Sequence, residues 1–252
     1  MPKWYVELYA GPEILHLGKP FTRENQEVLS FLTTCLQDPS FTIIEMEGYH
    51  FWLSSDFEAL ASEEEVYQYA KNQLPILNGI MELKFGRDTC TIKIGDVYHP
   101  DNNGNLVRTV QRTTLVVESY PNENFLRAAN AQQPGTIDIL LMARNNSLIE
   151  EALQYYSLPH NWHNLEKIFE IIAKDVRKSE HNGKLSKGTF SNWARGWAND
   201  FLQTAHSYHW SGLGARHSSV ESEKRSRVTP MHLDKAIESI SDLFMKWLWT
   251  NP

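Results

Sequence analysis

The sequence predicts an α+β fold, with a mostly antiparallel sheet and two or more helices followed by an all-helical bundle. Runs of β-branched and aromatic residues, separated by turn signals, fill the first half of the chain. From about residue 122 onward, apolar residues recur instead with a helical period. We therefore expect a sheet domain over 1–120 and a helical domain over 121–252. The boundary is not sharp, and whether the halves share one core stays open.

The first predicted strand covers residues 4–10, WYVELYA, and ends at the turn signal Gly11-Pro12. Residues 22–36 carry Val and Leu at helical spacing and predict a helix. Residues 41–55 predict two strands that meet at a turn over Glu47-Gly48.

A capping box, Ser62-Glu-Glu-Glu65, begins the next predicted helix, because Ser62 can accept a backbone hydrogen bond while Glu65 reaches back. Its apolar face continues toward Leu77 and Ile80. Pro75 lies inside the pattern and predicts a kink or a split.

Three further strands are predicted over 81–86, 89–95 and 107–120, separated by Gly-, Asp- and Asn-rich turns. The last of them alternates in polarity and predicts a sheet with one wet face and one face covered by helices. Asp101-Asn-Asn-Gly104-Asn resembles a calcium loop, but it lacks the terminal Glu, so we expect a hairpin turn.

The second half predicts helices throughout. The clearest covers residues 161–178, where apolar residues from Trp162 to Val176 make one stripe and most charged residues lie off it. The other predicted helices cover 122–132, 136–144, 146–157, a stretch through Trp193 and Leu202, and 231–249 after Pro230.

Composition limits the function classes. Aromatic residues make up 12% of the 252 residues, which is enough for a substantial core. The formal net charge of −7 excludes a general basic surface, so any nucleic-acid binding must be local. Cys35 and Cys90 are expected to be buried thiols. We expect no signal peptide, no membrane span and a cytoplasmic location.

Residues 205–219, AHSYHWSGLGARHSS, contain most of the candidate site residues. One interpretation is a polar corner between two helices, because His and Gly are common at helix C-termini. The other is an anion site, in which a Gly-x-Gly loop presents backbone N–H groups beside Arg216. The candidate binding residues are His206, His209, Gly212 and Gly214, and Arg216-His217 is the pair to substitute first.

A second cluster runs from His160 through His163 to Glu166. We interpret its beginning as a capping loop and His163 as a helix-surface residue, in preference to a metal site. The sequence thus predicts neither a metal nor a cofactor.

From Trp162 to Trp247 the order of features resembles a helical module found at the C-terminus of uncharacterised bacterial proteins. These features are NWHNLEKIFEII, a helix ending in FLQTAH, then SGLGARH, a charged loop and a helix beginning MHLDKAI. The resemblance implies a shape and no activity. The polar Arg-His corner is also loosely similar to HEPN-type and abortive-infection proteins.

HEPN ribonucleases carry an Arg-x(4–6)-His motif, and Arg227-VTPM-His232 has this spacing. The resemblance implies that His moves a proton while Arg stabilises charge on an RNA phosphate. Two features depart from the pattern: Arg216 and His217 are adjacent, and Pro230 interrupts the Arg227–His232 match.

Three functions follow as expectations, and whether the chain is an enzyme stays open. The first is a bacterial interaction or assembly module, with a protein partner or a second copy of itself, in a defence or phage-related system. The alternative is a metal-independent HEPN-like ribonuclease that cleaves RNA. Its candidate catalytic residues are Arg216, His217, Arg227 and His232. The third is another enzyme or a small-ligand binder that uses the sheet.

Overall fold

The computed structural model describes residues 3–10, 37–39, 41–46, 49–85, 92–110, 135–207, 211 and 230–250. As the sequence predicts, the fold is α+β, with an antiparallel sheet in the N-terminal half and most helices in the C-terminal half. The chain divides into two compact units, 1–131 with 135–140 and 132–134 with 141–252. The helices expected over 22–36 and 122–132, and both cysteines, lie outside the described residues.

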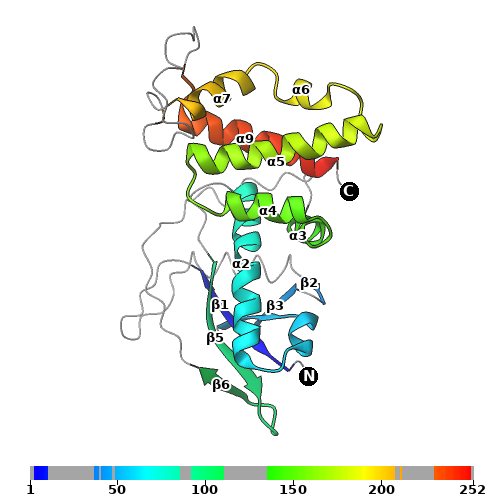
Figure 1. Ribbon diagram of the computed structural model, residues 1–252. Coiled ribbons are helices and arrows are strands. Elements are labelled where there is room, and N and C mark those ends of the chain that lie inside the picture. Colours follow the sequence, from blue (N-terminus) through cyan, green and yellow to red (C-terminus); the bar gives the residue numbers. More distant parts are fainter. Residues whose placement is uncertain are drawn as a thin grey trace. The chain divides into compact units, whose positions relative to one another are not determined.

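Six strands form the sheet of the first unit, in the order β2-β3-β4-β1-β5-β6 (Figure 1). All neighbouring strands pair antiparallel. The strands are β1 (Tyr5–Ala10), β2 (Gln37–Asp38), β3 (Phe41–Met46), β4 (Tyr49–Leu53), β5 (Ile92–Pro100) and β6 (Leu106–Val110).

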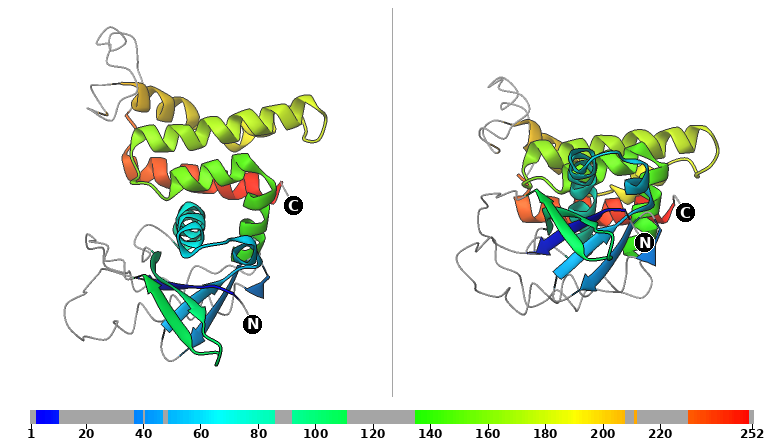
Figure 2. Two further views of the ribbon diagram at one scale, coloured as in Figure 1. Left: turned by 60° about the horizontal axis from the view of Figure 1, so that its bottom comes forward. Right: turned by 90° about the horizontal axis from the view of Figure 1, so that it is seen from below.

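One face of this sheet packs against a helix. Val6 stands opposite Trp52 and Val97 in the ladder, and all three side chains are buried. Trp52 contacts Phe57 of the 3-10 helix η1 (Ser55–Ala59), and Phe57 meets Tyr69 of helix α2 (Glu63–Phe85). Figure 2 shows α2 and the sheet as two layers. Burial alternates with period 2 at the start of β3, whereas β4 and β5 contain consecutive buried residues.

Helix α2 corrects one prediction from the sequence. The strand expected over 81–86 is wrong, because residues 81–85 are the last turn of a single helix. Ile80 and Met81 are both buried, so the apolar face of the helix continues past the expected break. Pro75 lies inside α2 and does not split it. The capping box forms in part: the Glu65 backbone N–H donates to Ser62 Oγ over 3.3 Å.

The predicted hairpin turn between β5 and β6 is confirmed. The Asp101 backbone N–H donates to the Asn105 carbonyl, and the Asp101 carboxylate accepts from the backbone N–H groups of Asn103 and Asn105. These hydrogen bonds hold the Asp101 pKa below its ordinary value.

The second unit is a bundle around helix α5 (Trp162–His181), with α4 (Ser147–Tyr156), α6 (Thr189–Trp193), α7 (Ala198–His206) and α9 (Leu233–Trp249) packed on it. Helix α3 (Thr136–Asn145) crosses the division between the units. Phe169 of α5 contacts the rings of Phe190, Trp197 and Phe201, which explains why α6 and α7 lie against α5.

The helix expected through Trp193 and Leu202 is in fact two helices. Residues 194–197 form turns between α6 and α7, and Gly196 has a φ of 85°. A backbone in this left-handed region cannot continue a right-handed helix. Among the described residues, no helix combines the length and apolar character needed to cross a bilayer.

Candidate active site at the end of helix α7

The structure describes two of the eight site residues named from the sequence. His206 is the last residue of α7, and His232 is the N-cap of α9. The others lie outside the described residues: His209, Gly212, Gly214, Arg216, His217 and Arg227.

His206 faces a carboxylate that comes from the central helix. Its Nε2 lies 2.6 Å from Glu166 Oε1, although the two residues are 40 positions apart in sequence. The Glu166 side chain is 3% exposed and the His206 side chain is 40% exposed. This hydrogen bond between Nε2 and the carboxylate fixes the orientation of the imidazole ring.

Local structure brings this pair together. Phe201 and Ala205 are buried on the side of α7 that faces the bundle. His206 follows Ala205 directly, at the last turn of the helix. On α5, Glu166 lies among the buried residues Trp162, Leu165 and Phe169. Packing of the two apolar faces therefore brings the histidine and the carboxylate within hydrogen-bond distance.

The sequence pattern does not identify Glu166 as the partner of His206. Most charged residues of the predicted helix over 161–178 are expected on its polar side, yet Glu166 is buried. A signal was present: Glu166 lies four residues after Trp162 and three before Phe169, which is the spacing of the apolar stripe. A buried charge at such a position requires a polar partner. His163, by contrast, is exposed as predicted, and Asn161 caps α5 by accepting from the Asn164 N–H.

Thr204 connects the end of α7 to the beginning of α9. Its Oγ1 accepts a 2.9 Å hydrogen bond from the Met231 N–H, and its carbonyl accepts one from the Ser211 hydroxyl. Thr204 is itself buried. Ser211 and Met231, which are 20 positions apart in the sequence, are thus both bonded to one residue, two positions before His206.

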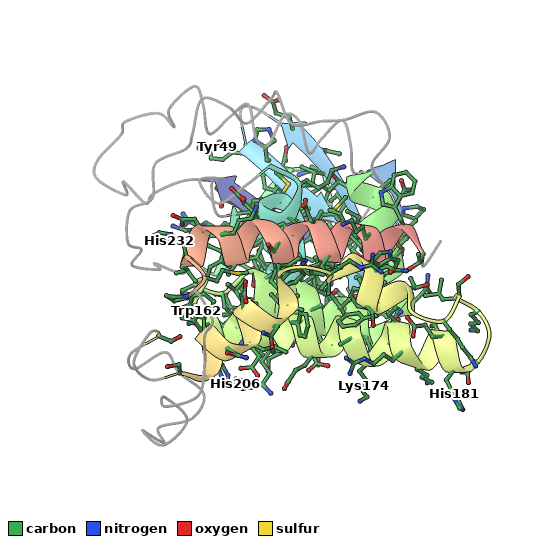
Figure 3. All side chains as sticks on the ribbon, turned by 90° about the horizontal axis from the view of Figure 1, so that it is seen from above. Tyr49, Trp162, Lys174, His181, His206 and His232 are labelled. Carbon is green, nitrogen blue, oxygen red and sulfur yellow. The ribbon has the colours of Figure 1, made fainter. Side chains whose placement is uncertain are left out.

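His232 lies beyond Met231 and is open to solvent. Its side chain is 84% exposed, and its Nδ1 lies 3.4 Å from Asp234 Oδ2. Figure 3 shows His206, His232 and Trp162 toward the same end of the helical unit. Two of the histidines named from the sequence are thus at one end of the helical unit.

The arrangement is suited to proton transfer. A buried carboxylate that holds one nitrogen of a partly exposed imidazole is the way proteins orient a histidine for acid–base chemistry. Among the described residues, no group of three or more His, Cys, Asp or Glu side chains is placed to hold a metal ion. Comparison with known protein families, curated proteins and solved structures found no match to this chain.

Proposed function

We propose that the helical unit is a metal-independent, HEPN-like ribonuclease in which His206, oriented by Glu166, takes part in proton transfer. The observation that carries the proposal is the 2.6 Å contact between a buried carboxylate and a partly exposed imidazole. The hydrogen bonds of Ser211 and Met231 to Thr204, two positions before His206, support it, because Arg216 and Arg227 lie between those two residues in the sequence.

The reaction would follow the usual chemistry of RNA cleavage without a metal. His206 accepts the proton of a ribose 2′-hydroxyl, and the 2′-oxygen attacks the adjacent phosphorus. The bond from phosphorus to the 5′-oxygen breaks, and a second histidine, His217 or His232, donates a proton to that oxygen. Arg216 and Arg227 stabilise the added charge on the phosphate. The products are a 2′,3′-cyclic phosphate and a free 5′-hydroxyl.

The test is incubation of the purified chain with mixed single-stranded RNA in the presence of EDTA. We expect cleavage that ends in cyclic phosphate, at least about 100-fold slower in His206→Ala, in line with the loss of a general acid or base. The Arg216→Ala/His217→Ala double variant should lose cleavage to a similar degree.

His163→Ala is the matched control, because His163 is an exposed histidine on the same helix as Glu166. It should cleave as the unmodified chain does. No cleavage by the unmodified protein, or equal cleavage by the unmodified protein, His206→Ala and the double variant, would remove the ribonuclease proposal.

The interaction or assembly module stays a prediction. Its expected signature is a continuous exposed apolar patch. The large exposed apolar side chains of the described residues lie on separate elements: Met46 and Tyr49 at one end of the β3–β4 pair, Val107 on β6, Leu158 after α4 and Trp249 at the end of α9. No particular observation favours this function over the ribonuclease.

A further inference from the structure

We propose that a pocket at the C-terminal ends of α5 and α9 binds the sugar-phosphate part of a small ligand. This proposal is independent of the ribonuclease. The pocket has a volume of about 350 Å³, which is at the lower end of the range for small-molecule sites, about 300–1,000 Å³. A mononucleotide or a phosphorylated sugar is of this size.

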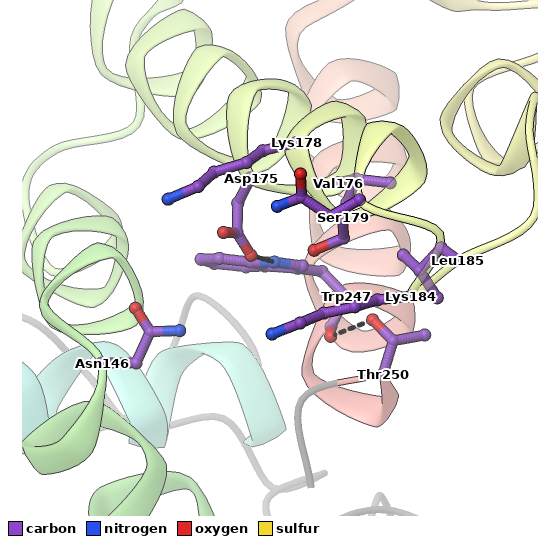
Figure 4. Close-up of a pocket in the computed structure, with 10 residues that line it drawn as sticks. Asn146, Asp175, Val176, Lys178, Ser179, Lys184, Leu185, Trp247 and Thr250 are labelled. Carbon is purple, nitrogen blue, oxygen red and sulfur yellow. Dashed lines mark hydrogen bonds between the residues drawn. The ribbon is translucent and has the colours of Figure 1, made fainter.

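The lining is polar and carries more positive than negative charge. Lys178 comes from the last turn of α5, and Lys184 comes from the turn that follows it. Neither lysine forms an ion pair with a carboxylate of another described residue. In Figure 4 both side chains extend toward the side of the pocket that Asn146 occupies. Two ammonium groups beside one cavity attract a phosphate group.

Among the described residues that line the pocket, Asp175 is the one with a carboxylate, and the protein holds it in place. Asp175 Oδ2 accepts a 2.9 Å hydrogen bond from the Trp247 indole Nε1–H, and Trp247 is fully buried. The buried ring therefore fixes the position of the carboxylate, as Figure 4 shows. A carboxylate fixed in this way is suited to accept hydrogen bonds from ligand hydroxyl groups. This favours a sugar phosphate over a bare anion.

Helix C-termini usually present unpaired carbonyl groups, which repel anions. Here two of the carbonyls around the pocket already accept hydrogen bonds from the protein. The Ser179 carbonyl accepts from the Lys184 and Leu185 N–H groups. The Trp247 carbonyl accepts from both the N–H and the hydroxyl of Thr250. Because protein donors satisfy these two oxygens, they repel an anion less than unpaired carbonyls would.

The two lysines could instead serve only to complement the helix dipole of α5, which favours cations in the last turn. The two roles differ in what they affect. If the role is purely structural, replacing the lysines changes the stability of the chain, and the chain binds no sugar phosphate. A binding role requires a ligand whose affinity falls when the lysines are removed.

The experiment is isothermal titration calorimetry of the full chain with ribose 5-phosphate, with AMP and with unphosphorylated ribose. We expect ribose 5-phosphate or AMP to bind and ribose not to bind. Tighter binding of AMP would indicate a mononucleotide as the ligand, and tighter binding of ribose 5-phosphate would indicate a phosphorylated sugar. Replacing either lysine (Lys178→Ala or Lys184→Ala) should weaken binding by about tenfold or more, because a charge-assisted contact to phosphate is lost.

Lys174→Ala is the matched control, because Lys174 is exposed on α5 and does not line the pocket. It should bind as the unmodified chain does. Circular dichroism verifies that each variant is folded. Absence of binding by both phosphorylated probes, or equal binding by Lys174→Ala, Lys178→Ala and Lys184→Ala, would overturn the proposal. Neither result depends on RNA cleavage, so the two proposals fail separately.

Discussion

At the scale of single residues, Glu166 and His206 form a hydrogen-bonded pair, and we expect substitutions at the two positions to lower stability by unequal amounts. Removing the histidine takes away the donor that faces a buried carboxylate, whereas Gln at position 166 keeps an oxygen at the same place. Losing the partner of a buried charged group costs more than a neutral replacement that can still accept a hydrogen bond.

We therefore expect His206→Ala to lower the free energy of unfolding by about 1–3 kcal/mol, and Glu166→Gln to lower it by less. Urea denaturation followed by circular dichroism measures both values. The double variant Glu166→Gln/His206→Ala should be more stable than His206→Ala alone, because no buried charge then remains to be compensated. If His206→Ala costs less than Glu166→Gln, loss of the partner of a buried carboxylate is not the dominant effect and the expected order is wrong.

A second cluster of charges lies on the sheet face opposite Val6. The side chain of Glu7 on β1 accepts hydrogen bonds from the Asp96 N–H and the Tyr98 hydroxyl on β5, both 3.3 Å long. Arg108 of β6 forms an ion pair with the buried carboxylate of Asp96. Burial, and then the negative charge of Asp96, raise the pKa of Glu7, while burial and the charge of Glu7 raise the pKa of Tyr98 to about 12.

The raised pKa of Glu7 predicts the direction of a pH effect on stability. The folded chain holds the Glu7 proton to higher pH than the unfolded chain does, so its stabilising contribution is complete below pH 4.5 and is lost as pH rises through the folded pKa. Glu7→Gln keeps an acceptor for both hydrogen bonds without the charge. We expect this variant to melt at a higher temperature than the unmodified chain at pH 8.

Melting temperatures at pH 4 and pH 8 test this expectation, and the gain from Glu7→Gln should shrink at pH 4. Glu151→Gln serves as the control, because Glu151 is exposed on α4. A gain that is equal at both pH values, or a loss at pH 8, would show that the charge on Glu7 is not the cause.

At the scale of elements, one glycine decides that α6 and α7 are separate helices. Gly196 has a φ of 85°, and apart from its two chain neighbours no described residue has a heavy atom within 4 Å of the position a Cβ would take. The effect of a substitution there is therefore a backbone effect and not a steric clash with a neighbouring side chain.

Gly196→Ala should lower the free energy of unfolding by about 1 kcal/mol, because the left-handed region disfavours a Cβ. Gly196→Asn should cost less, since Asn tolerates this conformation better than Ala. Chemical denaturation measures the difference. If Ala and Asn have equal effects, backbone conformation at this position does not determine stability.

At the scale of the whole molecule, the net charge of −7 limits how RNA can bind. The proposed ribonuclease has to hold phosphates with a few local cations, of which Arg216 and Arg227 are the candidates. Each contact to single-stranded nucleic acid contributes about −0.7 to the slope of log affinity against log salt concentration.

We expect a shallow slope of about −1 to −2 for a short single-stranded RNA, and a slope less negative by about 0.7 for Arg216→Ala. Fluorescence anisotropy over a range of salt concentrations measures both, with His206→Ala as the background so that RNA cleavage is slow during the measurement. A slope steeper than about −4 would instead indicate a broad basic surface, which the composition does not provide.

How much the sequence predicts differs between elements. Apolar periodicity predicts α5 and α9 well, because one face of each helix carries their burial. The same reasoning fails at 81–86, where Met-Glu-Leu-Lys-Phe suits a strand or a helix, and the preceding helix continues through it. At the site, the sequence identified His206 by its position in a polar stretch, but it did not identify the partner.

The sequence by itself determined the α+β class, the order of most described elements and the polar stretch that begins at His206. These features are encoded locally, in turn residues and in the spacing of apolar side chains. Only the tertiary structure decided that Glu166 faces His206, that Ser211 and Met231 meet at Thr204, and that Asp175 is held by Trp247. Each of these contacts joins separate parts of the chain, so its formation depends on how the helices pack and not on any local pattern.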